Sequence, residues 1–213
     1  MNRNIARLEV GLFSTNCWVY ICDDGVFVID PGGDAESIIN FLESKQIVPS
    51  HILLTHGHFD HVLALPQIHG AFPDAEIAIH RADCDFVGDN AFKRHCSDCK
   101  AAAGHDRFIR DNWQDMPSAT RFLEDGGTAG PFAVLHTPGH TEGSVSFYDR
   151  DARVLFSGDT LFRGGIGRTD LWGGDTDKMN ESLKRLLTLA DETRVFPGHG
   201  DPTTIGMEKT AGY

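Results

Sequence analysis

Three histidines and one aspartate stand within six consecutive positions, residues 56–61. The apolar run 52–54 comes just before them and predicts a buried strand, and the run 62–65 follows and predicts the apolar face of a helix. The group therefore lies where a strand gives way to a helix, a common place for reactive side chains on a rigid frame. Imidazole and carboxylate donors suit zinc, iron, manganese or nickel, so we expect a metal site.

The spacing of these four donors favours two ions over one. His56, His58 and Asp60 alternate, so an extended segment projects them to one side, whereas His61 follows directly and points elsewhere. Two adjacent ions that take two donors each are an easier geometry than one ion that takes all four from so short a loop. The competing interpretation, a polar loop of solvated histidines, does not explain why the loop lies between two apolar runs.

Three later loops share one pattern. Each places a single His or Asp beside a glycine and just past an apolar strand: His140 after 132–136, Asp159 after 154–156, and His199 after 195–196. Glycine permits a sharp turn and the close approach of a ligand. One such loop is a weak indication, but the three together supply the donors that a two-metal site still lacks.

The bulk composition indicates an acidic globular protein. The 213 residues include 31 Asp and Glu against 19 Lys and Arg, a formal net charge of −12, which argues against nucleic acid or anionic lipid as a partner. Residues 1–17 lack the apolar core of a signal peptide, and no run approaches the roughly 18 apolar residues of a membrane helix. Five cysteines, an odd number, fit a reducing compartment, so a cytoplasmic protein is expected.

The order of predicted elements is strands first, then alternating strand and helix, twice over. Strands are expected at 8–13, 17–22, 26–29, 51–54, 76–80, 132–136, 144–148, 154–156 and 195–196, with helices after a capping Asp34, at 59–72 and at 176–189. This order favours two sheets packed face to face with helices outside, in one domain over 1–213. Residues 81–120 have no clean period and predict short helices, a helical insertion near the site.

The chain resembles the metallo-β-lactamase-fold superfamily, whose members carry H-x-H-x-D-H followed by a distant His, Asp and His. The resemblance runs from 15–17 and 28–33 to 197–200, and the stretch 158–170 points to the glyoxalase II-like branch. It implies an α/β fold, a four-layer αββα sandwich with two mixed sheets face to face. It also implies two divalent metal ions, zinc first with iron or manganese as alternatives, and the following ligands: His56, His58 and His140 for one ion, Asp60, His61 and His199 for the other, and Asp159 bridging both.

The same resemblance implies a binuclear-metal hydrolase that cleaves a thioester, S-lactoylglutathione or a related small-molecule acyl-thiol. A hydroxide bridging the metals would attack the acyl carbon, with Asp60 and Asp159 as the catalytic carboxylates. The family's early aspartate matches Asp30, which is structural rather than a ligand. Typical glyoxalase II enzymes add a C-terminal helical domain that binds glutathione, whereas 13 residues follow Gly200 in this chain. The thiol carrier and the oligomeric state therefore stay open.

Two other activities of this fold are alternatives. Persulfide dioxygenases also carry a G-R-T-D stretch and hold one iron with two His and one Asp, which would be His56, His140 and Asp159. A metallo-hydrolase of broader specificity is the second alternative. The lack of an export signal argues against a β-lactam hydrolase, and a metal-loaded binding module without turnover is a further class. Metal count and metal identity distinguish the hydrolase from the dioxygenase.

Several other reactive residues are interpreted as structural. Cys96 and Cys99 form a C-x-x-C pair, but a second pair is missing, so a zinc knuckle is not expected. Arg163 and Arg168 flank a glycine-rich loop and are expected to form internal salt bridges rather than to contact a substrate. Cys17 is expected to be a small buried hydrophobe.

Overall fold

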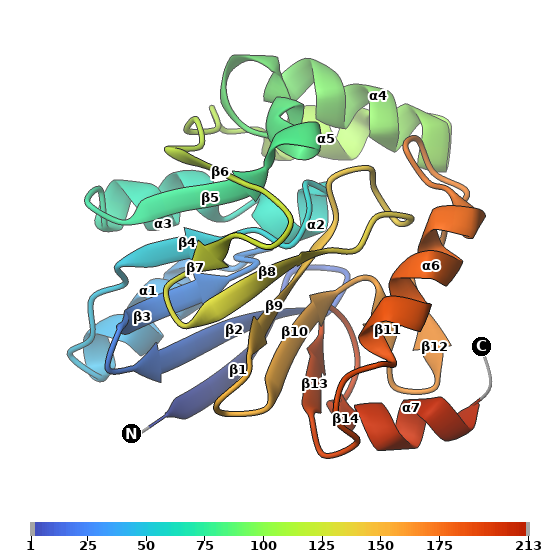
Figure 1. The fold of residues 1–213 in the computed structure, drawn as a ribbon. Helices are drawn as coiled ribbons and strands as arrows, with labels where there is room; N and C mark the ends of the chain where they lie inside the picture. Colours follow the sequence, from blue (N-terminus) through green and yellow to red (C-terminus); the bar gives the residue numbers. More distant parts are fainter. Residues whose placement is uncertain (1–2, 212–213) are drawn as a thin grey trace.

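Two six-stranded sheets pack face to face in the computed structural model, which describes residues 3–211 (Figure 1). The first sheet has the order β1 (Asn4–Val10), β2 (Thr15–Cys22), β3 (Gly25–Ile29), β4 (His51–Leu53), β5 (Glu76–His80) and β6 (Arg121–Leu123). The pairs among β1, β2 and β3 are antiparallel, and those from β3 to β6 are parallel. Parallel neighbours need a crossover, and α1 (Ala35–Ser44), α2 (Phe59–Val62) and α3 (Leu65–Ala71) lie in these crossovers.

The second sheet comes from the later part of the chain. Its order is β14 (Thr203–Thr204), β13 (Arg194–Pro197), β10 (Val154–Gly158), β9 (Val145–Asp149), β8 (Phe132–His136) and β7 (Thr128–Ala129). Only β10 and β13 pair in parallel, and α6 (Thr176–Leu186) lies in their crossover. A short ribbon of β11 (Leu161–Phe162) and β12 (Gly165–Ile166) precedes that helix, and α7 (Ile205–Ala211) follows β14.

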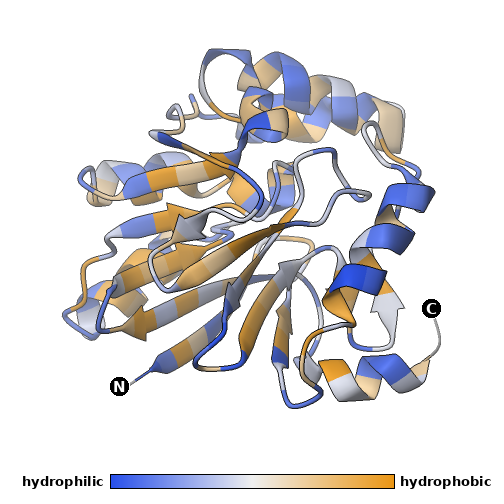
Figure 2. Cartoon of the chain, in the orientation of Figure 1, coloured by the Kyte–Doolittle hydropathy of each residue, from blue (hydrophilic) through white to orange (hydrophobic). Residues whose placement is uncertain are grey.

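Alternate residues of the strands fill three apolar layers. Between the sheets, Tyr20, Phe27 and Phe156 are fully buried with Phe132. On the outer face of the first sheet, Val28 packs with residues of α1 and α3, and on the outer face of the second, α6 packs with residues of β10 and β13. Both faces of each sheet are covered, which explains the nearly continuous apolar runs of the strands (Figure 2).

The expected helix at 59–72 is two helices, and Pro66 explains the break. Proline has no N–H and its ring collides with the carbonyl four residues earlier, so it is tolerated only in the first turn. Accordingly α2 ends at Val62 and α3 begins at Leu65 with Pro66 in its first turn. Asp34 precedes α1 as expected but forms no side-chain cap; its carboxylate accepts a hydrogen bond from the Gly11 N–H at 2.8 Å.

The irregular region 81–120 folds into short helices at the upper end of the sheets in Figure 1. These are two 3₁₀ helices (Arg81–Phe86 and Gly88–Asn90), α4 (Ala91–Ala103) and α5 (Arg107–Asn112). The buried Cys96 and Cys99 pack with Ile109 in a small apolar cluster. No helix among residues 3–211 is long and apolar enough to cross a membrane. That the chain forms one domain stays a prediction.

Candidate metal centre

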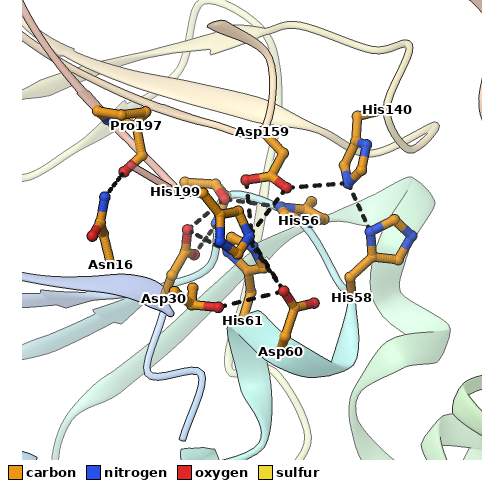
Figure 3. Close-up of polar contacts among 12 residues, drawn as sticks. Asn16, Asp30, His56, His58, Asp60, His61, His140, Asp159, Pro197 and His199 are labelled. Atoms are coloured by element: carbon orange, nitrogen blue, oxygen red, sulfur yellow. Dashed lines mark hydrogen bonds and ion pairs between the residues drawn. The ribbon is translucent and has the colours of Figure 1, made fainter. Parts of the chain in front are cut away.

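The donor loops leave the carboxyl ends of strands in both sheets and meet at one edge. Residues 54–58 follow β4, residues 137–140 follow β8, Asp159 directly follows β10, and His199 follows β13. Ligand sites of open α/β sheets lie beyond the same strand ends. The structure brings all seven predicted ligands together there (Figure 3). They form two groups whose donor atoms lie within 4.8 Å of one another, with Asp159 beside both: His56, His58 and His140, and Asp60, His61 and His199.

The first group brings ring nitrogens of three histidines together, and a backbone partner fixes the tautomer of His140. Nδ1 of His140 lies 2.8 Å from the carbonyl oxygen of Arg168, which can only accept, so this nitrogen carries the proton and Nε2 carries the lone pair. That Nε2 faces Nδ1 of His58 at 2.8 Å. With the ring nitrogen of His56 close by, these two nitrogens could hold a shared cation.

A chain of hydrogen bonds sets the tautomer of His56. The Thr55 hydroxyl donates to Oδ2 of Asp30 at 2.6 Å, so its oxygen is left to accept from Nδ1–H of His56 at 3.1 Å. Nε2 of His56 is therefore unprotonated. It is buried and receives no hydrogen bond from the described residues, so its lone pair is available to a metal ion.

The second group is oriented in the same way. Nδ1–H of His61 donates to Asp30 at 3.0 Å, and Nδ1–H of His199 donates to the carbonyl oxygen of Phe13 at 3.1 Å. Their two Nε2 atoms then face each other at 3.3 Å. Asp60 Oδ2 lies 3.3 Å from Nε2 of His199 and 3.7 Å from Nε2 of His61. These three donors are close enough together to hold a second cation.

Asp159 lies between the two groups. Its Oδ2 is 3.5 Å from Nε2 of His140 in the first group and 3.5 Å from Nε2 of His199 in the second, and its Oδ1 is 3.4 Å from Nε2 of His61. Figure 3 shows its carboxylate reaching toward both sides. Oδ1 is buried and has no hydrogen-bond partner among the described residues. A carboxylate in this place fits a bridge between two cations.

The electrostatics of the centre favour bound cations. Burial, together with the neighbouring imidazoles, holds the pKa of His56 and of His58 well below the usual range. Burial also opposes a charge on His61, but the carboxylates of Asp159 and Asp60 outweigh it and hold its pKa well above that range. Burial raises the pKa of Asp159, yet the positive charge of His61 outweighs this and lowers it. Buried carboxylates need positive charge nearby, which metal ions supply.

Asp30 also lies close to His56 and His61, so by distance alone it is a candidate ligand. Its carboxylate is already committed, because it accepts from the Thr55 N–H at 2.8 Å, the Thr55 hydroxyl and Nδ1–H of His61. Asp30 also adopts a left-handed backbone, with φ of 54°, and such strain is typical of functional sites. We assign it the structural role expected from the sequence: it orients one ligand directly and another through Thr55.

The loop of His199 is fixed by contacts to β2. The side-chain amide of Asn16 donates to the carbonyl oxygens of Pro197 at 2.9 Å and Gly200 at 2.8 Å. Between them, Gly198 leaves room for the centre, because a Cβ at this position would collide with Oδ1 of Asp159 and lie 2.7 Å from the His61 ring. The glycine noted in the sequence beside His199 is therefore required by close packing.

A further buried carboxylate, Asp83, was not singled out from the sequence. It accepts hydrogen bonds from the Gly57 N–H at 2.9 Å, the Thr141 hydroxyl at 2.7 Å and the Gly143 N–H at 2.8 Å. It therefore ties the loop of His56 and His58 to the loop of His140. The only sequence signal was its place shortly after a strand, which it shares with many ordinary residues.

A cavity of about 570 Å³ opens onto the centre. Asp60, His140, Asp159 and His199 line one side of it, and residues from α4, α5 and the loop after β12 line the other. The region 81–120 thus contributes a wall of the cavity. Residues of both donor groups therefore face the same cavity.

Comparison with known proteins identifies the relatives of this chain. The family model described as Metallo-beta-lactamase superfamily matches residues 10–199. Hydroxyacylglutathione hydrolase GloC of Haemophilus influenzae (strain ATCC 51907 / DSM 11121 / KW20 / Rd) is 36% identical over 208 residues, covering 97% of this chain and 95% of its own. The crystal structure of TTHA1623 in a di-iron-bound form has a TM-score of 0.82, 37% identity, and coverage of 97% of this chain and 98% of that one. The BLEG-1 B3 metallo-beta-lactamase structure has a TM-score of 0.84 and 37% identity, with 97% of each chain covered.

Two mixed sheets with outer helices and two adjoining histidine–aspartate groups define a metallo-hydrolase. The chain belongs to the metallo-beta-lactamase superfamily. The predicted αββα fold and family are confirmed, and so is a histidine–aspartate metal site of the binuclear kind. The role of each single ligand, the identity of the metal and the substrate stay predictions.

Proposed function

We propose that this protein hydrolyses thioesters of small-molecule acyl-thiols, with S-lactoylglutathione or a related compound as substrate, using two divalent metal ions. The observation that supports two metal ions most directly is the complete second donor group, Asp60, His61 and His199, beside the first. The 36% identity to a protein named hydroxyacylglutathione hydrolase supports the thioester. The two groups fit zinc, iron or manganese, since all three accept nitrogen and oxygen ligands.

Bound metal ions would supply Lewis acidity and a water whose pKa falls from 15.7 toward about 7. Around them the chain turns the ring protons of His140, His199 and His61 away from the centre, through the carbonyls of Arg168 and Phe13 and the carboxylate of Asp30 respectively. Asp60 lines the cavity and receives a hydrogen bond from the Thr15 hydroxyl at 3.4 Å. In this proposal its carboxylate would accept a proton from the attacking water. The leaving thiolate needs little assistance, so cleavage of a thioester does not require a strong general acid.

Persulfide oxidation and β-lactam hydrolysis are the two alternative activities. A persulfide dioxygenase with a single iron would use His56, His140 and Asp159. It would not need the second donor group to hold a metal ion. β-Lactam hydrolysis is the second candidate, because a protein named B3 metallo-beta-lactamase is 37% identical over nearly the whole chain.

The test is an assay of purified, metal-quantified protein with three substrates in parallel. Thiol release from S-lactoylglutathione without oxygen uptake would support the proposal. Oxygen uptake with glutathione persulfide, or cleavage of a chromogenic cephalosporin, in the absence of thioester cleavage would overturn it. The Asp159→Asn variant should be inactive, whereas Asp74→Asn, at an exposed position remote from the centre, should match the wild type.

A further inference from the structure

Much of the cavity wall beside the metal centre is apolar. This apolar part is formed by Phe13, Phe59, Phe108, Leu171 and the paired alanines 102 and 103 at the end of α4, and Asp98, Cys99 and His105 line the cavity next to it. The three phenylalanine rings form one cluster, with centroid distances of 5.2, 5.5 and 6.4 Å. These rings come from the β1–β2 loop, α2 and α5. Three separate elements thus contribute to one apolar surface beside the reacting centre.

Apart from the metal ions that the centre would hold, arginine and lysine side chains free to meet a substrate carboxylate are scarce around this wall. Arg168 is the one arginine or lysine among the described residues that line the cavity, and its guanidinium forms a two-pronged pair with Asp170 at 2.7 and 2.8 Å. On the neighbouring helices, Arg94 pairs with Asp98 at 3.1 Å. A single carboxylate, that of Asp106, engages both Lys100 at 3.1 Å and Arg110 at 2.9 Å.

We infer that the cavity selects thioesters with an apolar acyl chain on an uncharged thiol carrier over thioesters of glutathione. This inference rests on the proposed thioester hydrolysis and names its substrate class. A glutathione thioester carries two carboxylates, and each would lose water against phenylalanine rings or displace an aspartate from its partner. An alkyl chain on the same wall instead gains from burial, by a factor of about four in kcat/KM for each fully buried methylene.

The experiment compares matched thioesters on the metal-loaded enzyme. Acetyl, butyryl, hexanoyl and lactoyl groups are each joined to N-acetylcysteamine, which is uncharged, and to glutathione. We expect kcat/KM to rise at least tenfold from acetyl to hexanoyl, and the N-acetylcysteamine ester to be cleaved faster than the glutathione ester of the same acyl group.

Two variants of the wall and one control connect the result to it. Phe108→Ala should reduce the hexanoyl-to-acetyl ratio of kcat/KM several-fold, whereas Phe122→Ala, an exposed ring on β6 outside the cavity, should keep it. Ala103→Arg places a cation at an exposed position of the wall. It should raise kcat/KM for glutathione esters relative to kcat/KM for the matched N-acetylcysteamine esters.

Faster cleavage of glutathione esters than of their matched neutral esters by the wild type, or a rate independent of chain length, would overturn the inference while leaving thioester hydrolysis in place. Cleavage of no thioester by the metal-loaded protein would instead overturn the proposed function itself, and this inference with it.

Discussion

Replacing Asp83 by alanine tests how the two ligand loops are held together. Asp83 touches no donor atom of the centre but binds backbone N–H groups on both loops, at Gly57 and Gly143, and the hydroxyl of Thr141. Without the carboxylate, both N–H groups stay buried and unpaired. The hydroxyl keeps Ser144 as a partner at 2.8 Å, so the loss concerns two donors rather than three.

The magnitude follows from these two donors. Each unpaired buried N–H costs about 1–3 kcal/mol, so the unfolding free energy should fall by roughly 4 kcal/mol before relaxation. Burial raises the pKa of Asp83, which means that the buried charge itself is costly and that its removal returns part of the loss. We therefore expect a net destabilisation of about 3 kcal/mol. For a chain of this size that corresponds to a fall in Tm of about 6–12 °C.

The assay pairs urea unfolding of the metal-free protein with a cobalt titration followed by absorbance. Partners that orient ligands typically change metal affinity by about 10–100-fold, and we expect a loss of this order. Asp85→Asn is the matched control, an exposed aspartate two positions away. If Asp83→Ala unfolds at the same urea concentration as this control and binds cobalt equally well, the reasoning about the two loops is wrong.

Three further predictions concern the centre and its surroundings. Asp159→Asn should retain fewer than two ions per chain and lose thioester hydrolysis; an active variant with two ions would refute the bridging role. Gly198→Ala places a Cβ against Asp159 and His61 and should lower metal content, unlike Gly70→Ala, whose Cβ meets no atom within 4 Å; equal metal content in both would contradict the packing argument. Burial lowers the pKa of His95 to about 4, whereas the unfolded value is about 6.5, so the unfolded state binds the extra proton between these values. The stability due to neutral His95 is complete above pH 6.5 and is lost as the pH falls to 4, by about 3 kcal/mol. Urea unfolding at pH 7, 5.5 and 4.5 should show a shallower decline for His95→Gln, and an unchanged decline would rule this origin out.

The residues that the structure brings together at the centre could be predicted from the sequence because their signal is local. The H-x-H-x-D-H motif and the three glycine-flanked loops each identify a donor within a few positions, and the strand before each loop gives its place at the sheet edge. The order of strands and helices likewise predicts two sheets with outer helices. In each of these patterns, a short stretch of sequence contains both the strand and the loop that follows it.

The residues that support the ligands could not be predicted, because their contacts join distant parts of the chain. Asp83 reaches 58 and 60 positions along the chain to Thr141 and Gly143. The carbonyl that orients His199 belongs to Phe13, 186 positions away. Every residue has a backbone carbonyl oxygen, so the sequence does not show which one orients a ligand. In the sequence, an aspartate in a short helix looks the same whether it is buried or exposed to solvent.

The helix boundaries in region 81–120 could not be predicted from hydrophobic periodicity, for a related reason. Helix α4 buries Cys96 and Cys99 against α5, buries Ala91 and His95 as well, and presents Ala102 and Ala103 to the cavity. A helix with several different neighbours has no single apolar stripe. Its boundaries and its place beside the centre therefore emerge only from the folded structure.

The central claim is that the two groups of donors hold two ions joined by Asp159. A crystal structure of the metal-loaded protein, with anomalous data at the absorption edge of the bound element, tests it directly. We predict two anomalous peaks, one enclosed by His56, His58 and His140 and one by Asp60, His61 and His199, each in contact with Asp159. A single peak, with the donors of the other group turned away from it, would contradict the account.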